Sequence, residues 1–209
     1  MKTSNSNIIW IGGSPDSGKS TIAKNLLRKY DLQFYDYDLL EDQHHDELAK
    51  HSTVAGVIHS SSIENSWVNT TPELLLERAN QSFKSRFPLV IRDLSTLDIH
   101  KVTLAEGFGL TPQLVSPYIS NPQQAIWLVS TIEFKKTSSA KRNKLCGLFT
   151  SKEMELLAKE NLLKRDMLID AQIRDEAKSL GMTIIEVNNE RTIEEISTLI
   201  ELHFRATLN

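Results

Sequence analysis

Residues 7–27, NIIWIGGSPDSGKSTIAKNLL, constrain this chain more than any other stretch. A short apolar run enters a glycine-rich turn, and a helical pattern follows. Gly13 is separated by four residues from Gly18, Lys19 and Ser20, which completes a G-x-x-x-x-G-K-S/T motif. A buried strand, a tight turn and a helix in this order predict a phosphate-binding loop.

The chemistry of a triphosphate explains this spacing. Glycines permit backbone turns that side chains would obstruct, so successive N–H groups can point inward at phosphate oxygens. The helix that follows adds the positive end of its dipole. We therefore expect one continuous set of residues to bind the phosphates of a nucleotide: Gly13, Ser14, Asp16, Ser17, Gly18, Lys19, Ser20 and Thr21.

Three side chains of the motif have expected roles. Lys19 can reach the outer phosphates, and the Ser20 hydroxyl can complete the ligand shell of a Mg²⁺ ion that keeps most of its waters. Thr21 carries the second hydroxyl, but we favour Ser20 as the metal ligand. The loop therefore predicts a bound nucleotide together with Mg²⁺.

Composition sets the class of protein. The 209 residues, 40% hydrophobic and 24% charged, fit a single domain spanning 1–209. A net charge of −3 offers no electrostatic footprint for nucleic acid. No apolar run approaches the length of a membrane span. Cys146 is the only cysteine, which fits a reducing compartment, so we expect a cytoplasmic protein without a membrane partner.

Two carboxylates follow the first helix. Residues 32–38, LQFYDYD, indicate a second strand that brings Asp36 and Asp38 to its carboxyl end, where ligands of open α/β sheets bind. The two lie on the same strand face by alternation, so alternation does not separate them. The histidine-rich segment after them lacks zinc spacing, and we interpret His44 and His45 as part of a polar helix face near a substrate pocket.

Residues 39–99 form the expected substrate-binding insertion. Thr71 and Pro72 predict the N-cap and first turn of a helix, which Pro88 should end or kink. Past this insertion, a buried strand ends in Glu106, and Thr111 caps another short helix. A carboxylate at such a strand end is suited to hold the water shell of Mg²⁺ or the substrate.

A basic run follows the strand AIWLVS. Lys135, Arg142 and other cations precede a long helix, and we interpret residues 136–150 as a mobile lid over phosphate. Capping boxes are predicted at Ser130, Thr150 and Thr192, each with glutamate three residues later. Five buried strands separated by helices predict an α/β fold with a parallel sheet covered on both faces.

The chain resembles small bacterial P-loop kinases of the nucleoside or nucleotide kinase-like kind, which are related to the chloramphenicol phosphotransferase and gluconate kinase groups. The guanine reader N-K-x-D of GTPases is missing, since Asn143-Lys144 continues with Leu145 and Cys146. The segments that carry the resemblance are IIWIGGSPDSGKSTIA, FYDYDLLEDQH, VTLAEGFGLTPQLV, AIWLVSTIEF and NLLKRDMLI.

What the resemblance implies is a three-layer P-loop sandwich with a five-stranded parallel sheet and a small lid. It implies ATP on the phosphate loop and Asp38 or Asp36 as the base. Glu106 is then the acid near Mg²⁺ or substrate, and Arg142 or Arg165 stabilises the transferred phosphate. The lid lacks the arginine pairs common in nucleoside monophosphate kinases, so these two arginines remain alternatives.

Two classes of function follow. The first is an ATP-dependent phosphotransferase acting on a hydroxyl of a small metabolite or nucleoside. The second is an ATP-dependent regulatory switch that binds a protein partner and has no metabolite kinase activity. Within the kinase class, a nucleotide-sugar kinase or a polynucleotide-end kinase stays open, although the acidic balance argues against the latter. The sequence leaves the acceptor and the oligomeric state undetermined.

Overall fold

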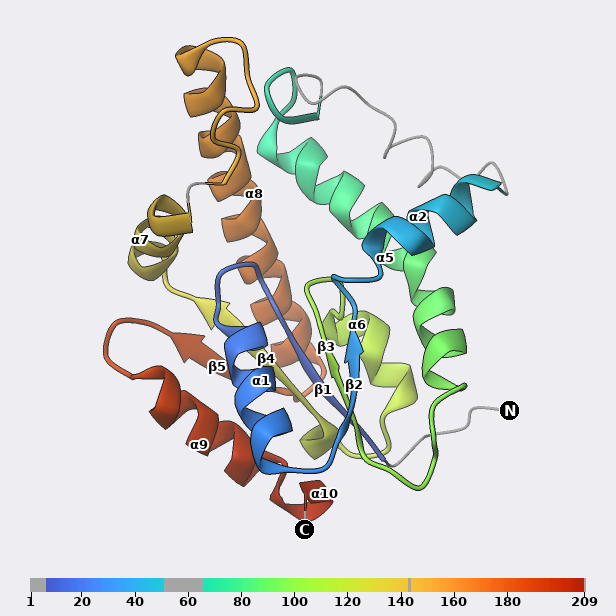
Figure 1. Ribbon diagram of the computed structural model, residues 1–209. Helices are drawn as coiled ribbons and strands as arrows, with labels where there is room; N and C mark the ends of the chain where they lie inside the picture. The colour runs from blue at the N-terminus through green and yellow to red at the C-terminus, as the bar shows by residue number, and fades with distance from the viewer. Residues whose placement is uncertain (1–6, 51–65, 143, 209) are drawn as a thin grey trace.

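A computed structural model describes residues 7–50, 66–142 and 144–208. Its centre is one sheet of five parallel strands in the order β2-β3-β1-β4-β5, with helices on both faces (Figure 1). This architecture confirms the expected three-layer α/β fold with a five-stranded parallel sheet.

The strands are β1 (Ile8–Gly13), β2 (Gln33–Asp36), β3 (Thr103–Glu106), β4 (Ala125–Ser130) and β5 (Thr183–Val187). The longer helices are α1 (Lys19–Lys29), α2 (Glu41–Lys50), α5 (Pro72–Leu94), α7 (Ile132–Arg142), α8 (Lys152–Ser179) and α9 (Ile193–His203). The short ones are α6 (Pro112–Val115), η1 (Ser116–Tyr118), η2 (Pro122–Gln124) and α10 (Arg205–Leu208).

Strand β1 lies in the middle of the sheet, and alternation along it separates two cores. Ile8 and Trp10 face the core beneath α5, α6 and α8. Ile9 and Ile11 face the other core, which α1 and α9 cover. Because both faces of β1 are buried, it is apolar throughout, as is usual for a central parallel strand.

The register aligns the carboxyl ends of β1, β2 and β3. Ile11 of β1 pairs with Glu106 of β3, and Glu106 pairs with Asp36 of β2. The carboxyl ends of the three strands therefore meet at the edge where β1 passes into α1. Figure 1 shows the N-terminal part of α8 extending beyond this edge.

Helix caps follow the sequence where the local signal is strong. Thr71, Thr111 and Thr192 cap α5, α6 and α9, each accepting a backbone N–H with its side chain. The capping box of Thr192 with Glu195 is confirmed. The box predicted at Thr150 is wrong by one residue, because the Ser151 hydroxyl accepts the N–H of Met154.

Three further boundaries differ from expectation. Ser130 is the last residue of β4, and Thr131 instead caps α7 by accepting the N–H of Phe134, so the box predicted at Ser130 is wrong. Helix α5 continues past Pro88 to Leu94, because Phe87, Val90 and Leu94 are buried against the sheet. The expected lid, 136–150, begins inside α7, which extends to Arg142.

No helix in the described ranges combines the length and the apolar character that crossing a bilayer requires.

Crowding at the end of β1 requires glycine. A Cβ on Gly12 would lie 2.3 Å from the Leu110 carbonyl oxygen and 2.3 Å from Nε1 of Trp127. That indole is buried and donates to the same carbonyl at 2.7 Å. Gly181, by contrast, has a φ of +64° and open space around the position of a Cβ.

Gly12→Ala should therefore lower the free energy of unfolding by about 3 kcal/mol, because backbone and a hydrogen-bonded indole have to move. The matched variant Gly181→Ala should cost only about 1 kcal/mol, the strain of a left-handed backbone without a clash. Urea denaturation of both variants measures this difference. Equal losses, or a larger loss at Gly181, would contradict the crowding argument.

Candidate active site

The phosphate loop turns between the end of β1 and α1. Gly13 has a φ of +135°, and a Cβ there would lie 2.1 Å from the Leu128 carbonyl oxygen of β4. Gly18 has a φ of +87° and precedes the first residue of α1. Both conformations suit glycine, and they let the loop curve around a space that its own backbone borders. The loop predicted from the motif is thus formed.

Lys19 starts α1 and is 5% exposed. Its Nζ donates to the carbonyl oxygen of Ser14 at 2.9 Å, and the Ser17 hydroxyl donates to the same oxygen at 2.9 Å. Burial lowers the pKa of Lys19, and the charges of Glu106 and Asp38 oppose that shift. The ammonium therefore lies inside the loop, among acidic groups at the strand ends.

Glu106 is 1% exposed at the end of β3. The Ser20 hydroxyl donates to its Oε1 at 3.4 Å. Burial raises the pKa of Glu106 to about 7, since the opposing effect of Lys19 is smaller and the charges of Asp38 and Asp36 act in the same direction as burial. A hydroxyl and a carboxylate that face each other are oxygen ligands of the kind Mg²⁺ takes, so this pair fits the predicted metal site.

Asp36 and Asp38 have different positions. Strand β2 ends at Asp36, whose Oδ1 accepts the N–H groups of Asp38 at 3.1 Å and Leu39 at 3.0 Å. Asp36 therefore stabilises the turn after the strand. Asp38 lies beyond β2 rather than on the same strand face, which corrects the expected strand of residues 32–38.

Asp38 lies in the cavity beside Lys19. Its Oδ1 accepts the N–H of Phe108 at 3.0 Å. Burial raises the pKa of Asp38, and the charge of Lys19 opposes the shift. The buried side chain of Arg86 on α5 supports the turn that carries Asp38: it donates to the Tyr37 carbonyl at 2.6 Å, and its guanidinium carbon lies 3.7 Å from the centre of the Tyr37 ring.

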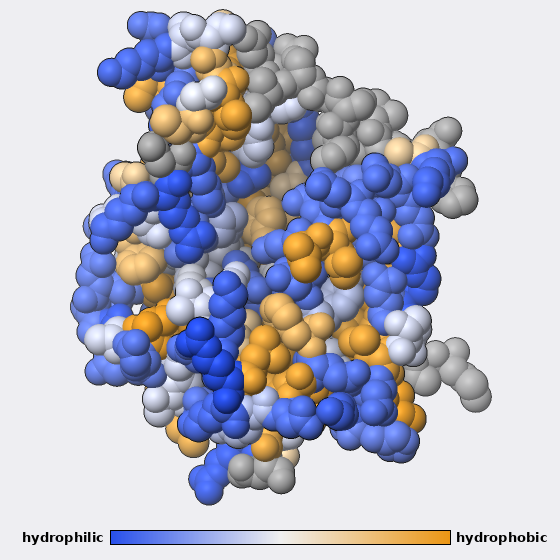
Figure 2. Space-filling view, in the orientation of Figure 1, coloured by the Kyte–Doolittle hydropathy of each residue, from blue (hydrophilic) through white to orange (hydrophobic). Residues whose placement is uncertain are grey.

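One cavity of about 610 Å³ joins these groups, and Figure 2 shows a hollow between the α8 side and the α2 side. It brings together the loop, the carboxylate of Asp38 and cations from the α7 and α8 region. Its lining residues are Pro15, Asp16, Gly18, Lys19, Ser20, Thr21, Lys24, Asp38, Glu41, Trp67, Phe108, Arg142, Lys144 and Arg165.

Both candidate arginines line the cavity. The side-chain nitrogens of Arg142 and Lys144 each lie 3.0 Å from Oδ1 of Asp16, and the carboxylate of Asp16 is buried. The backbone of Asp16 has a φ of +65°. Arg165 donates from Nε and Nη2 to Oδ1 of Asp166 at 2.9 and 2.6 Å. The side chain of Asp16 thus pairs with two cations of residues 136–150, the expected lid. The binding of phosphate by Asp16 stays a prediction, and it would use the backbone N–H.

Arg165 lies close to two aromatic rings. Its guanidinium carbon lies 5.2 Å from the ring centre of Trp67 and 5.4 Å from that of Phe108. Such stacking together with the Asp166 contact restricts the guanidinium to one orientation at the cavity wall. Trp67 and Phe108 gave no signal in the sequence, because a lone aromatic residue reads equally well as core.

The interpretation of His44 and His45 as part of a polar helix face near a substrate pocket is wrong. Both are buried, at 0% and 5% exposure, between α2 and α5. Nε2 of His44 lies 2.8 Å from Oδ2 of Asp93, and Nε2 of His45 lies 3.2 Å from the Ser82 hydroxyl. These contacts join the two helices instead of facing a substrate.

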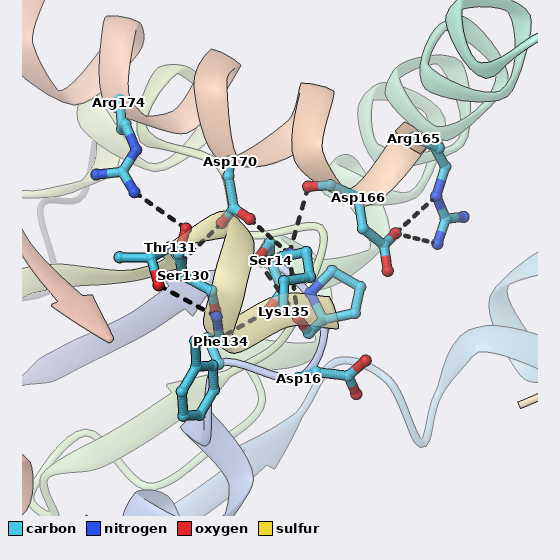
Figure 3. A network of polar contacts seen from close by, with 12 residues as sticks. Ser14, Asp16, Ser130, Thr131, Phe134, Lys135, Arg165, Asp166, Asp170 and Arg174 are labelled. Carbon is cyan, nitrogen blue, oxygen red and sulfur yellow. Dashed lines mark hydrogen bonds and ion pairs between the residues drawn. The ribbon is translucent and has the colours of Figure 1, made fainter. Parts of the chain in front are cut away.

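The position of Lys135 differs from the one that the sequence indicates. It belongs to the basic run, yet its side chain is 1% exposed and contacts Ser14 of the loop and Asp170 of α8 (Figure 3). Nothing in the sequence distinguishes Lys135 from the exposed lysines around it, because a run of charged residues does not indicate which side chain is buried.

No protein-family model matches the chain, and no curated protein matches its sequence. Solved structures do match. The structure of TT1252 from Thermus thermophilus is 18% identical over 97% of each chain, with a TM-score of 0.52.

Two shikimate kinases are also similar. The one from Acinetobacter baumannii, in complex with shikimate, is 18% identical over 97% of this chain and 96% of its own, with a TM-score of 0.46. The one from Bacteroides thetaiotaomicron is 11% identical over 95% of this chain and 97% of its own, with a TM-score of 0.48.

At these identities the likeness shows the fold alone, a parallel α/β sheet covered by helices. The phosphate loop of this chain lies at the end of the central strand of that sheet. The substrates named for the similar proteins are theirs.

The pKa of Glu106 generates a prediction for stability. The folded protein keeps this proton up to a pH of about 7, whereas an unfolded glutamate releases it near 4.5. Since the folded state then binds more protons than the unfolded state, Glu106 makes the protein progressively less stable as the pH rises from 4.5 to 7.

Glu106→Gln lacks this titration. The free energy of unfolding of the wild type, relative to that of Glu106→Gln, should fall by roughly 2–3 kcal/mol across this pH range. Urea denaturation of both proteins at several pH values gives the difference directly. A flat difference would show that folding leaves the pKa of Glu106 unchanged, and a difference that rises with pH would show that folding lowers it, and either result would contradict the prediction.

Proposed function

We propose that the protein transfers the γ-phosphate of ATP to a hydroxyl of a small metabolite or nucleoside. The observation that carries the proposal is the shared cavity: it contains the phosphate loop with Lys19, the carboxylate of Asp38 and the guanidinium groups of Arg142 and Arg165. A donor site, a base and cations for the transferred group thus border one space.

Each residue has a role in this proposal. The loop N–H groups and Lys19 bind the phosphates, and Ser20 with Glu106 would hold Mg²⁺, which supplies neutralisation of phosphate charge when bound. The transition state of phosphoryl transfer is loose and highly charged, so fixed cations aimed at it contribute most of the rate. Arg165 is suited to that task because its orientation is already restricted.

Asp38 is the proposed base. The acceptor oxygen attacks the γ-phosphorus, the bond from that phosphorus to the β–γ bridging oxygen breaks, and the hydroxyl proton passes to the Asp38 carboxylate. Asp36 is the weaker candidate, because its Oδ1 is engaged by two backbone N–H groups of the turn. A raised pKa brings Asp38 nearer to the pH at which a base is effective.

The acceptor lies toward Trp67, Phe108 and Arg165 in this proposal. These residues border the same cavity as Asp38, and they combine two aromatic rings with one cation. A small molecule with an apolar or planar face and an anionic group would match that lining.

A panel of hydroxyl-bearing metabolites and nucleosides with Mg²⁺-ATP tests the proposal. Lys19→Ala should abolish transfer. Asp38→Asn keeps the acceptor for the Phe108 N–H, so it should lower kcat about 10²- to 10³-fold while ATP affinity stays within about twofold. The matched variant Asp36→Asn keeps its turn contacts and should lower kcat less than about fivefold.

Two results would count against this function. One is ATP binding without transfer to any member of the panel, combined with ATP-dependent capture of a protein partner that Asp38→Asn leaves intact, which is the behaviour of a regulatory switch. The other is a larger loss of kcat in Asp36→Asn than in Asp38→Asn, which would assign the base to Asp36.

A further inference from the structure

Lys135 forms a buried junction between the phosphate loop and the two helices that flank the lid. Its ammonium lies 2.5 Å from Oδ2 of Asp170 on α8 and donates to the Ser14 hydroxyl at 2.6 Å (Figure 3). The carbonyl oxygens of Pro15 and Asp166 lie 3.4 Å away. Three elements, α7, α8 and the loop, thus meet on a single cation.

Asp170 extends the junction to the sheet. It is 5% exposed, and its Oδ1 accepts the N–H of Ser130, the last residue of β4, at 3.1 Å. Arg174, one helical turn further along α8, donates to the Ser130 carbonyl at 3.1 Å. The carboxylate is therefore fixed by the backbone of β4, and Lys135 is held against a rigid partner (Figure 3).

Stability alone does not explain this arrangement. Moving an ammonium and a carboxylate out of water is costly, and apolar residues of similar volume in the place of a buried ion pair are often neutral or stabilising. Lys136, the next residue along, is exposed, so a charge at this point of the run is easily solvated. The inward turn of Lys135 instead gives the Ser14 hydroxyl a fixed partner.

Ser14 is the residue through which Lys135 can act on the loop. Its hydroxyl accepts from Lys135, while its carbonyl accepts from both Lys19 and Ser17. Ser14 therefore binds Lys135 of α7 through its hydroxyl and Lys19 of the loop through its carbonyl oxygen. A change in the orientation of Ser14 would move the oxygen to which Lys19 is bonded.

We propose that Lys135 is a positioning residue which, through the Ser14 hydroxyl and with Asp170 as its counterion, holds the phosphate loop in its nucleotide-binding shape. The inference rests on the proposed function, in that the loop binds nucleotide phosphates. Because part of the ordering of the loop then precedes binding, losing the junction weakens nucleotide affinity rather than the fold.

Two variants separate this role from general effects. Lys135→Met/Asp170→Asn removes both charges together, so the net charge is unchanged and no lone charge stays buried, and the asparagine Oδ1 still accepts the Ser130 N–H. Ser14→Ala removes only the hydroxyl and leaves the ion pair in place. Lys136→Met, which removes one exposed charge at the neighbouring position, is the control.

The measurement is the dissociation constant of Mg²⁺-ADP, by titration calorimetry, together with the thermal midpoint of each protein without nucleotide. We expect the dissociation constant to rise about tenfold in Ser14→Ala and in the double variant, with no further rise when the three substitutions are combined, because they break the same contact. Lys136→Met should bind as the wild type does. The thermal midpoints should stay within a few degrees of the wild type.

Wild-type affinity in Ser14→Ala would overturn the inference even if the double variant failed to fold. Additive losses in the triple variant would also overturn it, since the two changes would then act independently. If the wild type binds Mg²⁺-ADP and Lys19→Ala weakens it while Ser14→Ala does not, only the positioning role fails. If the wild type binds no nucleotide, the proposed function fails with it.

Discussion

The close approach of β1 to β4 at Gly12 and Gly13 is the constraint on which the rest of the site depends. Only glycine fits there, because a side chain on either residue would enter the backbone of Leu110 or of Leu128. The chain has to turn at once, and α1 starts with Lys19 buried under the turn. In the same register, Glu106 ends β3 beside Ile11, which brings a carboxylate to the mouth of the loop.

Charge at this edge is nearly balanced within the protein itself. Lys19 is near the charges of Glu106 and Asp38, Lys135 pairs with Asp170, and Asp16 pairs with Arg142 and Lys144. Under the proposed function, a nucleotide phosphate entering the cavity would compete with Asp16 for Arg142 and Lys144.

The sequence predicts those parts of the fold that short-range chemistry determines. The loop motif, the five strands and the threonine caps at Thr71, Thr111 and Thr192 are each specified within a few residues, and each is present. The expectation that all five strands are buried holds for β1, β3 and β4, whereas the edge strands β2 and β5 are only partly buried. Pro88 is expected to end or kink its helix, but α5 does not end there. The packing of Val90 and Leu94 in the core outweighs the loss of one backbone hydrogen bond at the proline.

Distant contacts account for what could not be predicted. The roles of Asp36 and Asp38 separate only once the turn after β2 and the N–H of Phe108 are placed. Lys135 is an unexceptional member of a basic run until α8 brings Asp170 opposite it. The buried histidines of α2 likewise depend on partners from α5 that lie tens of residues away along the chain.

The central claim is that one cavity holds the donor phosphates and the acceptor on either side of Asp38. A crystal structure with Mg²⁺ and a non-hydrolysable ATP analogue tests it most directly. The account predicts the γ-phosphate within hydrogen-bond distance of Lys19, the metal on Ser20 beside Glu106, and the Asp38 carboxylate facing open space next to that phosphate. A nucleotide bound away from the loop, or a γ-phosphate screened from Asp38 by protein, would contradict it.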